Sequence, residues 1–170
     1  MLGVGRKTRR IVPEVKDRLF TPAQPIFPML PAGQSPVIRR GVVAVVSRGG
    51  RLLVIRRSAE VVAPGAMCFP GGGIEAGESE IDALVREVRE ELGVAVVPLR
   101  RLHQSVTPWN VDLAWWSARL DPGTPLVLNA AEVESVHWLT PDEILAAPEL
   151  LASNRDFLHA ILRGEIVLEP

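Results

Sequence analysis

The sequence has too little cysteine, and apolar runs that are too short, for several classes of protein. Cys68 is the single cysteine, which excludes an internal disulfide and any cysteine-based zinc site. The longest apolar runs are short, such as VVAVV at 42–46, whereas a helix that spans a bilayer needs roughly 18 apolar residues in a row. No apolar segment follows the basic residues of the N-terminus, as it would in a signal peptide. We therefore expect no membrane partner and a cytoplasmic location.

The chain also lacks the net charge that would attract a polyanion. Its formal net charge is −1, which gives no reason to expect a nucleic-acid polymer as a partner. The remaining composition, 47% hydrophobic and 23% charged, is ordinary for a globular protein. At 170 residues, the chain is most simply one domain with its own core and an appendage.

The appendage is a proline-rich arm at residues 1–36. Proline at this density blocks a regular helix or a central strand, so we expect a flexible or extended arm. An alternative is a lid or an arm that forms a homodimer, because the segment 26–30 contains apolar side chains to bury. The prolines are Pro13, Pro22, Pro25, Pro28, Pro31 and Pro36.

Residues 37–170 have the pattern of an α/β layered domain. Residues 37–46 and 51–57 read as two strands that the turn at 47–50 joins into a hairpin. Thr140 opens a short helix with proline in its first turn, and Ser153 or Asn154 caps a last helix that ends near Leu162. Further strands are expected at 94–97, 101–106, 111–120 and 133–139.

A third helix follows the glycine run at 71–73. Ser79 is its expected N-cap and Gly93 its C-terminal stop. At 100° per residue, one apolar stripe docks the helix on the sheet, and three glutamates share a neighbouring face where Ala83 leaves room for something to approach. The stripe consists of Ile81, Leu84, Val85, Val88 and Leu92, and the glutamates are Glu87, Glu90 and Glu91.

The three glutamates conflict with local physics. Like charges three or four residues apart repel, and acidic groups in a last helical turn face the negative end of the helix dipole. A divalent cation would offset this charge, and oxygen ligands without histidine or cysteine suit Mg²⁺, Mn²⁺ or Ca²⁺. Because Mg²⁺ usually recruits substrate phosphates, the cluster favours phosphate chemistry. The alternative is a solvated helix face with pairs such as Arg86–Glu90.

The spacing decides between these interpretations. The pattern G-x5-E-x7-R-E-U-x-E-E-x-G-U, in which U is a bulky aliphatic residue, resembles the Nudix box of the Nudix hydrolase family. All nine specified positions match, and chance agreement at nine positions is negligible. They are Gly72, Glu78, Arg86, Glu87, Val88, Glu90, Glu91, Gly93 and Val94.

This resemblance implies an α/β/α sandwich with a mixed sheet. It also implies hydrolysis of a nucleoside diphosphate linked to another moiety, with Mg²⁺ or Mn²⁺ as cofactor. By the family pattern, Arg86 holds the glutamates by ion pairing, and Glu78 supports the loop or an outer-sphere water. The metal ligands would be the Gly72 carbonyl and the carboxylates of Glu87, Glu90 and Glu91.

Three further positions resemble those of MutT-type members of the family. Arg57 would contact a phosphate, Glu132 would act as an additional metal-binding or base glutamate, and Asn154 would read a purine. Each position has an ordinary alternative: a surface charge, a strand-edge acid and an N-cap. Glu134 competes with Glu132 for its role. The tryptophans Trp109, Trp115 and Trp116 could stack a base, although core packing is the commoner use of tryptophan on a strand.

The resemblance leaves several functions open. We favour a (d)NTP pyrophosphatase that acts on purine nucleotides, oxidised ones included, and releases a nucleoside monophosphate and pyrophosphate. The nearest alternative is an ADP-sugar or dinucleotide hydrolase. A non-catalytic module that senses a nucleotide is a second class, but such modules typically lose box glutamates, and none is lost here. A plain interaction domain is a third.

Overall fold

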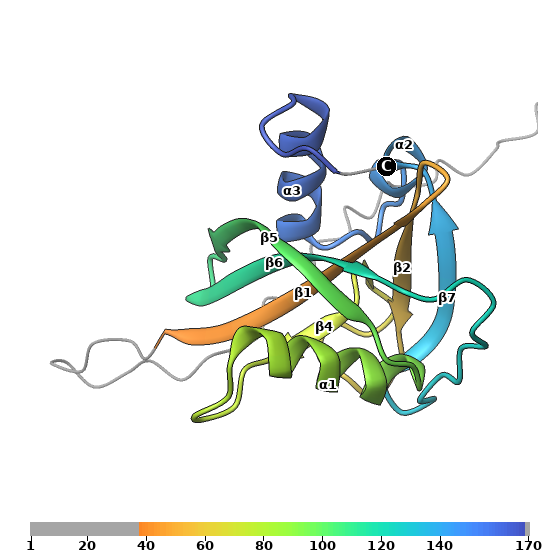
Figure 1. Ribbon diagram of the computed structural model, residues 1–170. Helices are drawn as coiled ribbons and strands as arrows, with labels where there is room; N and C mark the ends of the chain where they lie inside the picture. The colour runs from red at the N-terminus through yellow and green to blue at the C-terminus, as the bar shows by residue number, and fades with distance from the viewer. Residues whose placement is uncertain (1–37, 169–170) are drawn as a thin grey trace, which may run out of the picture. The chain divides into compact units, whose positions relative to one another are not determined.

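The computed structural model describes residues 38–168 (Figure 1). The proline-rich arm, and with it the predictions of a lid or a dimer-forming segment, lies outside the described residues. No helix in the described part is long and apolar enough to cross a membrane. The strands are β1 (Arg39–Arg48), β2 (Arg51–Arg57), β3 (Met67–Cys68), β4 (Gly71–Gly73), β5 (Val97–Val106), β6 (Val111–Arg119) and β7 (Val133–Leu139). The helices are α1 (Glu80–Leu92), α2 (Pro141–Leu145) and α3 (Ala152–Leu162).

The strands form one mixed sheet in the order β3-β2-β1-β6-β5, with β4 paired to β1 and β7 paired to β2. The β1–β6 pair is parallel, and the other pairs are antiparallel. The hairpin that the sequence predicts is confirmed, because Ser47 pairs with Leu52 and Arg48 with Arg51 across the turn. The glycine run is itself a strand and lies along the first half of β1.

Strand β1 is buried on both faces, which explains its unbroken apolar sequence. Val42, Ala44 and Val46 pack in a core with α1, whereas Val43 and Val45 pack in a second core with α2 and α3. This alternation follows from the two-residue period of a strand. Helix α1 covers one face of the sheet and α3 the other (Figure 1). The predicted α/β/α sandwich with a mixed sheet is therefore confirmed.

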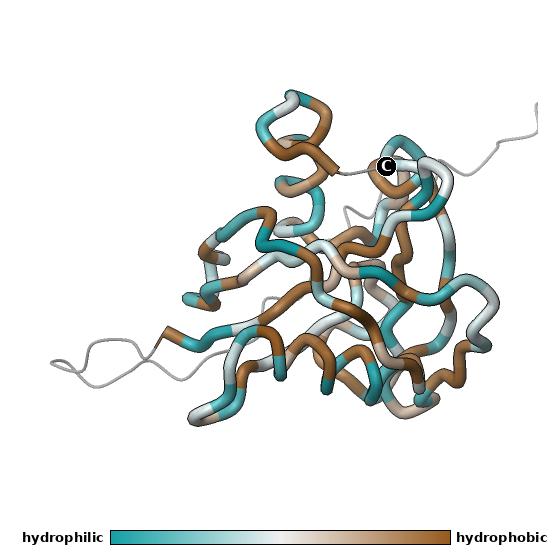
Figure 2. Tube along the Cα trace, in the orientation of Figure 1, coloured by the Kyte–Doolittle hydropathy of each residue, from teal (hydrophilic) through white to brown (hydrophobic). Residues whose placement is uncertain are grey.

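Helix α1 begins and ends where the sequence predicts. The Ser79 side chain accepts from the Asp82 N–H, and Gly93 adopts the left-handed conformation that ends the helix. The predicted apolar stripe is partly wrong, because Ile81 is 46% exposed and Ala83 is fully buried. The helix is rolled so that Glu91 also faces inward, at 4% exposure. Along the tube, α1 alternates between hydrophobic and hydrophilic residues (Figure 2).

Two other sequence predictions need correction. The strand expected at 94–97 is wrong except at its last residue, because residues 94–96 are in no strand and β5 begins at Val97. The strand expected at 101–106 belongs to β5, in which register shifts near Pro98 and Arg101 replace the predicted break. Helix α3 has Leu151 at its N-cap, without a side-chain hydrogen bond. Neither Ser153 nor Asn154 caps it, because both lie inside the first turn. The helix start predicted at Thr140 is confirmed, and a capping box with Glu143 opens α2 there.

Candidate active site

The three glycines of β4 each meet one residue of α1. The Gly71 N–H donates to Glu91 Oε2 at 3.0 Å, and the Gly73 carbonyl accepts from Arg86 Nη2 at 2.8 Å. At the middle position, a Cβ added to Gly72 would lie 2.3 Å from the carboxylate carbon of Glu87. Any other residue at position 72 would collide with Glu87 in this arrangement, so glycine is needed there for space and not for its backbone conformation. The glycine strand thus brings backbone groups directly against the acidic helix.

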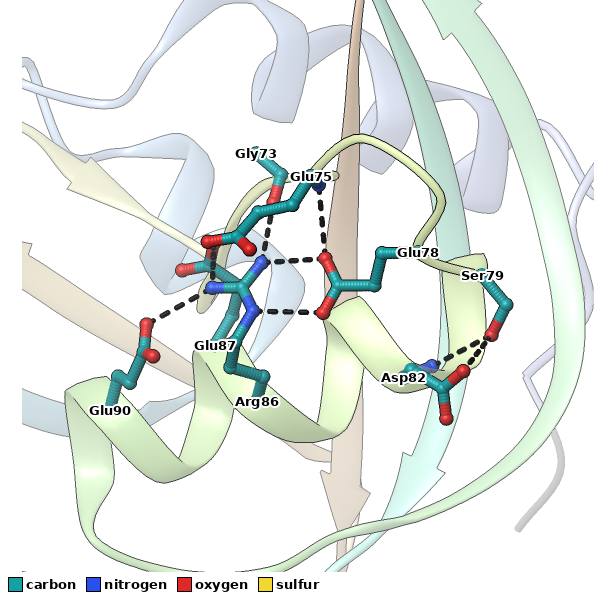
Figure 3. A network of polar contacts seen from close by, with 8 residues as sticks. All are labelled: Gly73, Glu75, Glu78, Ser79, Asp82, Arg86, Glu87 and Glu90. Carbon is teal, nitrogen blue, oxygen red and sulfur yellow. Dashed lines mark hydrogen bonds and ion pairs between the residues drawn. The ribbon is translucent and has the colours of Figure 1, made fainter.

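Arg86 lies at the centre of this contact, with Glu78 on one side and Glu87 and Glu90 on the other (Figure 3). Its Nε and Nη2 donate to the two carboxylate oxygens of Glu78, both at 2.9 Å. Its Nη1 donates to Glu87 at 2.9 Å and to Glu90 at 3.1 Å. Together with the bond to Gly73, these contacts occupy all five N–H groups of the guanidinium. Arg86 therefore has no donor left for a substrate in this arrangement.

Glu78 is held on both sides. Besides its paired bonds to Arg86, its carboxylate accepts from the backbone N–H of Glu75 at 3.0 Å. The hydrogen bonds from Arg86, and then that from Glu75, lower the pKa of Glu78 to about 2. Glu78 thus ties the loop before α1 to Arg86, which agrees with the supporting role that the family pattern implies.

Glu87 and Glu91 are carboxylates at a site that disfavours their charge. Burial raises the pKa of Glu91 to about 8, although the Gly71 N–H opposes this effect, and the charge of Glu87 raises it further. Burial also raises the pKa of Glu87, against the bonds from Arg86. Glu90 differs, because its side chain is 49% exposed. The acidic cluster therefore has more negative charge than its arginine neighbours offset.

Arg57, at the end of β2, is close enough to Glu91 for its charge to influence the pKa of that carboxyl. A register shift between Arg56 and Arg57 sends the two side chains to different surroundings. Arg56 pairs with Glu149 at 3.0 Å, whereas Arg57 donates through Nε to the Val62 carbonyl at 2.7 Å. The charge of Arg57 is among the influences that lower the pKa of Glu91, after burial and the Gly71 bond. The predicted phosphate contact of Arg57 remains a prediction, now placed next to the acidic cluster.

Glu132 reaches the same cluster from the turn before β7. Its charge contributes to the raised pKa of Glu87 and of Glu91, after burial and the closer neighbours of each. Asn129 Nδ2 donates to Glu132 Oε1 at 3.2 Å. Sequence reasoning missed Asn129, although an asparagine that bonds to the backbone two residues on is a known turn signal. Glu134, the competing candidate, is exposed on β7.

Asn154 is part of the protein interior, where it is 4% exposed. Its Oδ1 accepts from the Phe69 N–H at 2.8 Å, and its Nδ2 lies 3.2 Å from Ser153 Oγ. The N-cap alternative is therefore wrong. The amide fixes the backbone that leads into Gly71, and the purine contact expected for Asn154 stays a prediction.

A cavity of about 210 Å³ lies between β5 and α3. Its lining combines an aromatic side, with His103 and Phe157 at a ring distance of 6.2 Å, with polar side chains that include Ser105, Ser153 and Asp156. The sequence did not predict this cavity, because β5 and α3 are far apart in the chain and no local sequence pattern indicates that they pack together.

The tryptophans have separate roles. Trp115 is buried and stacks on Phe157 at 4.1 Å, so it belongs to the core. Trp116 donates its indole N–H to Glu80 at 2.9 Å. Trp109 is 41% exposed between β5 and β6, and it is the most exposed of the three.

The acidic cluster has the donor chemistry of a hard divalent cation, because all of its side-chain ligands are oxygens. Within residues 38–168, no three histidine, cysteine, aspartate or glutamate side chains are already gathered closely enough to hold a metal ion. The reason is visible in the contacts, since Arg86 holds Glu87 and Glu90 while Gly71 holds Glu91. Binding of a cation would therefore exchange some of these hydrogen bonds for metal contacts.

The fold and this cluster define a Nudix protein. A model of the NUDIX domain matches residues 37–161, and the chain belongs to the Nudix hydrolase family. Members of the family act on nucleoside diphosphate derivatives and generally use divalent metal ions.

Known relatives agree with this assignment. The chain is 36% identical over 110 residues to the CTP pyrophosphohydrolase of Escherichia coli (strain K12), over 63% of this chain and 79% of that protein. It is 35% identical over 102 residues to a MutT-like protein of Streptomyces ambofaciens, over 59% of this chain and 62% of that protein, less than two thirds of its length. The crystal structure of the MutT protein from Methanosarcina mazei Go1 superposes with a TM-score of 0.66 at 26% identity, over 75% of this chain and 94% of that one.

Proposed function

We propose that this protein is a divalent-metal-dependent pyrophosphohydrolase that converts a nucleoside triphosphate to a nucleoside monophosphate and pyrophosphate. One observation carries the proposal. Glu91 is 4% exposed, has a pKa raised to about 8, and lies among two further carboxylates and Arg57. Such a site favours a bound cation on one side and a phosphate group on the other.

The box residues would hold the cation. Glu87, Glu90 and Glu91 would supply carboxylate oxygens and Gly72 its carbonyl, with Mg²⁺ or Mn²⁺ as the expected ion. When bound, such an ion offsets the charge of the phosphates and makes water a better nucleophile. Arg86 keeps the glutamates in position and does not contact the substrate.

The remaining side chains would act on the substrate. Water attacks one phosphorus of the anhydride, and the bridging oxygen leaves with the other phosphate. Glu132 accepts the proton that the water gives up, and later returns it to solvent. Arg57 binds a phosphate oxygen and holds the anhydride in line.

The nucleoside would occupy the cavity between β5 and α3. Its aromatic side can pack against a base, and its polar side chains can pair with base edges. The purine preference expected from Asn154 would use Nδ2, since Oδ1 already accepts from Phe69. A pyrimidine triphosphate is the second candidate, because the Escherichia coli relative is named for CTP.

A substrate panel tests this proposal. Values of kcat/KM are measured with Mg²⁺ for (d)NTPs, oxidised purine nucleotides, ADP-ribose, NADH and diadenosine polyphosphates. We expect the highest value for a nucleoside triphosphate, with pyrophosphate as a product. A clear preference for ADP-ribose or a dinucleotide would leave the family assignment intact and overturn the triphosphate proposal. Binding without hydrolysis of any nucleotide would indicate a sensing module instead.

A further inference from the structure

The segment between β6 and β7 is bonded to the C-terminal end of α1, where the glutamates lie. The Val127 N–H donates to the Leu92 carbonyl at 2.9 Å, and the Asn129 N–H donates to the Glu91 carbonyl at 3.0 Å. These carbonyls are among the last four of α1, which have no partner inside the helix. A Cβ on Gly93 would lie 2.8 Å from Val127, so the close approach depends on glycine there. The backbone of this segment is therefore held against the end of α1 that bears the glutamates of the box.

Asn129 uses both ends of its amide inside the segment. Its Oδ1 accepts from the Ala131 N–H at 3.2 Å, which closes a turn, and its Nδ2 donates to Glu132 Oε1 at 3.2 Å. An ionised carboxylate only accepts hydrogen bonds, so this bond fixes one oxygen of Glu132 and leaves the other for a ligand. Within residues 38–168, no hydrogen bond to Glu132 Oε2 is found.

Ser58 holds the same turn from the opposite side. It is 5% exposed, its N–H donates to the Glu132 carbonyl at 2.9 Å, and its hydroxyl donates to the Ala131 carbonyl. Because Ser58 directly follows Arg57, the chain that presents the arginine also anchors the backbone of Glu132. The two groups on which the proposed chemistry depends are thus held in one arrangement.

We propose that Asn129 is a positioning residue, which orients the Glu132 carboxylate so that its free oxygen takes the proton of the attacking water. Ser58 fixes the backbone beneath it. This inference rests on the proposed function, in which Glu132 is the proton acceptor. The bond from the Asn129 N–H to the Glu91 carbonyl, together with the side-chain bond from Asn129 to Glu132, places the Glu132 carboxylate at the box end of α1.

Asn129→Asp separates the orienting bond from the turn. The substitution keeps the oxygen that accepts from Ala131, replaces the donor to Glu132 with an acceptor, and adds a like charge beside that carboxylate. We expect kcat for the preferred nucleotide to fall by about tenfold or more, with little change in KM. Asn129→Ser is a second variant, for use if the aspartate variant folds poorly. The shorter serine hydroxyl keeps the turn but does not reach Glu132, so we expect the same fall in kcat.

A double-mutant cycle shows whether Asn129 acts through Glu132. We expect Glu132→Gln to lower kcat by about 100-fold or more, and Glu134→Gln, the matched control on β7, to leave kcat unchanged. In the double variant Asn129→Asp/Glu132→Gln, the introduced amide can donate to the introduced carboxylate, so the melting temperature should recover. Its kcat should stay at the level of Glu132→Gln alone, because no proton acceptor is restored.

Two results would overturn the positioning role. The first is a kcat loss from Asn129→Asp that multiplies with that of Glu132→Gln, which would mean that Asn129 acts elsewhere. The second is an active parent whose kcat is insensitive to Glu132→Gln or to both Asn129 variants. A folded parent that hydrolyses no nucleotide would overturn the proposed function, and with it the positioning role. The activity of the parent protein therefore distinguishes a failure of the proposed function from a failure of the positioning role alone.

Discussion

At the scale of single residues, Glu91 is a buried carboxyl group whose ionised form is disfavoured in the metal-free protein. Its pKa is raised from 4.5 to about 8, so between these values the folded protein binds a proton that the unfolded chain has lost. The stability that this proton provides is fully present below pH 4.5 and is lost as the pH rises through about 8. Raising the pH over this range therefore weakens the metal-free fold.

Glu91→Gln should remove most of this pH dependence. Glutamine keeps the shape and can accept the Gly71 N–H, but it does not ionise. In EDTA, we expect the variant to melt higher than the parent near pH 8 and to differ little from it near pH 4.5. Thermal melts across this range measure the effect, with the exposed Glu134→Gln as control. Parallel pH profiles for parent and variant would show that Glu91 is not the carboxylate responsible.

Asn154 has a structural role, the hydrogen bond from Phe69, and a proposed role in reading a purine. Two variants distinguish these roles. Asn154→Ala leaves the buried Phe69 N–H without a partner, which should cost about 1–3 kcal/mol of unfolding free energy. Asn154→Asp keeps the accepting oxygen and removes the Nδ2 donor, but it also adds an ionisable group at a buried position. If Asn154 reads a purine, the folded fraction of the aspartate variant should lose discrimination between purine and pyrimidine triphosphates.

The measurement for Asn154 is kcat/KM for both base classes in parent and Asn154→Asp. A reduction of the purine preference by roughly tenfold or more would support base reading. An unchanged preference in a folded variant would leave Asn154 with its structural role alone, as the anchor of the backbone before Gly71.

At the scale of elements, the position of α1 depends on its first residue as well as on its apolar face. Glu80 accepts from Trp116 at 2.9 Å, from Arg101 at 3.1 Å and from Arg40 at 3.3 Å. These donors come from β6, β5 and β1, so one carboxylate with 20% exposure ties the helix to three strands. The glutamates of the box lie about two to three turns further along the same helix.

Glu80→Ala should therefore weaken metal binding from a distance. We expect a loss of about 1–3 kcal/mol in unfolding free energy and a higher Mg²⁺ concentration for half-maximal turnover. Glu149→Ala is the control, since it removes an exposed ion pair with Arg56, and solvent screens such pairs. The same Mg²⁺ dependence in both variants would show that Glu80 does not position the helix.

At the scale of the whole molecule, the box and its sheet begin after the proline-rich arm, which we propose to be dispensable for chemistry. Deletion of residues 1–32 should leave most of the turnover per folded site. Weaker substrate binding by a folded truncated protein would identify the arm as a lid, and a change from dimer to monomer in sedimentation would identify it as an assembly element. Loss of turnover at saturating substrate would contradict this proposal.

Much of the fold could be predicted from the sequence, because it is encoded locally. The caps at Ser79 and Gly93, the hairpin before β2 and the opening of α2 at Thr140 each depend on a few neighbouring residues. The box spacing predicted the family. What local patterns did not give was the inward roll of α1 that buries Ala83 and exposes Ile81.

Most of the missed features depend on contacts between distant segments. Burial of Glu91 needs the Gly71 N–H, and the interior position of Asn154 needs the backbone of Phe69. The support of Glu132 by Ser58 joins residues more than seventy positions apart, whereas the bond from Asn129 to Glu132 is local. A helical wheel or a motif places residues on a face, but only the tertiary structure shows which face is covered.

The central claim is that the carboxylates of α1, together with a divalent cation, hydrolyse a phosphoric anhydride. The most direct measurement is pyrophosphate release from a nucleoside triphosphate by the parent and by Glu91→Gln, each with saturating Mg²⁺ and with EDTA. We predict release by the parent with Mg²⁺, none with EDTA, and a rate lower by orders of magnitude in the folded variant. Equal rates for parent and variant at saturating Mg²⁺, or release by the parent that persists in EDTA, would contradict the claim.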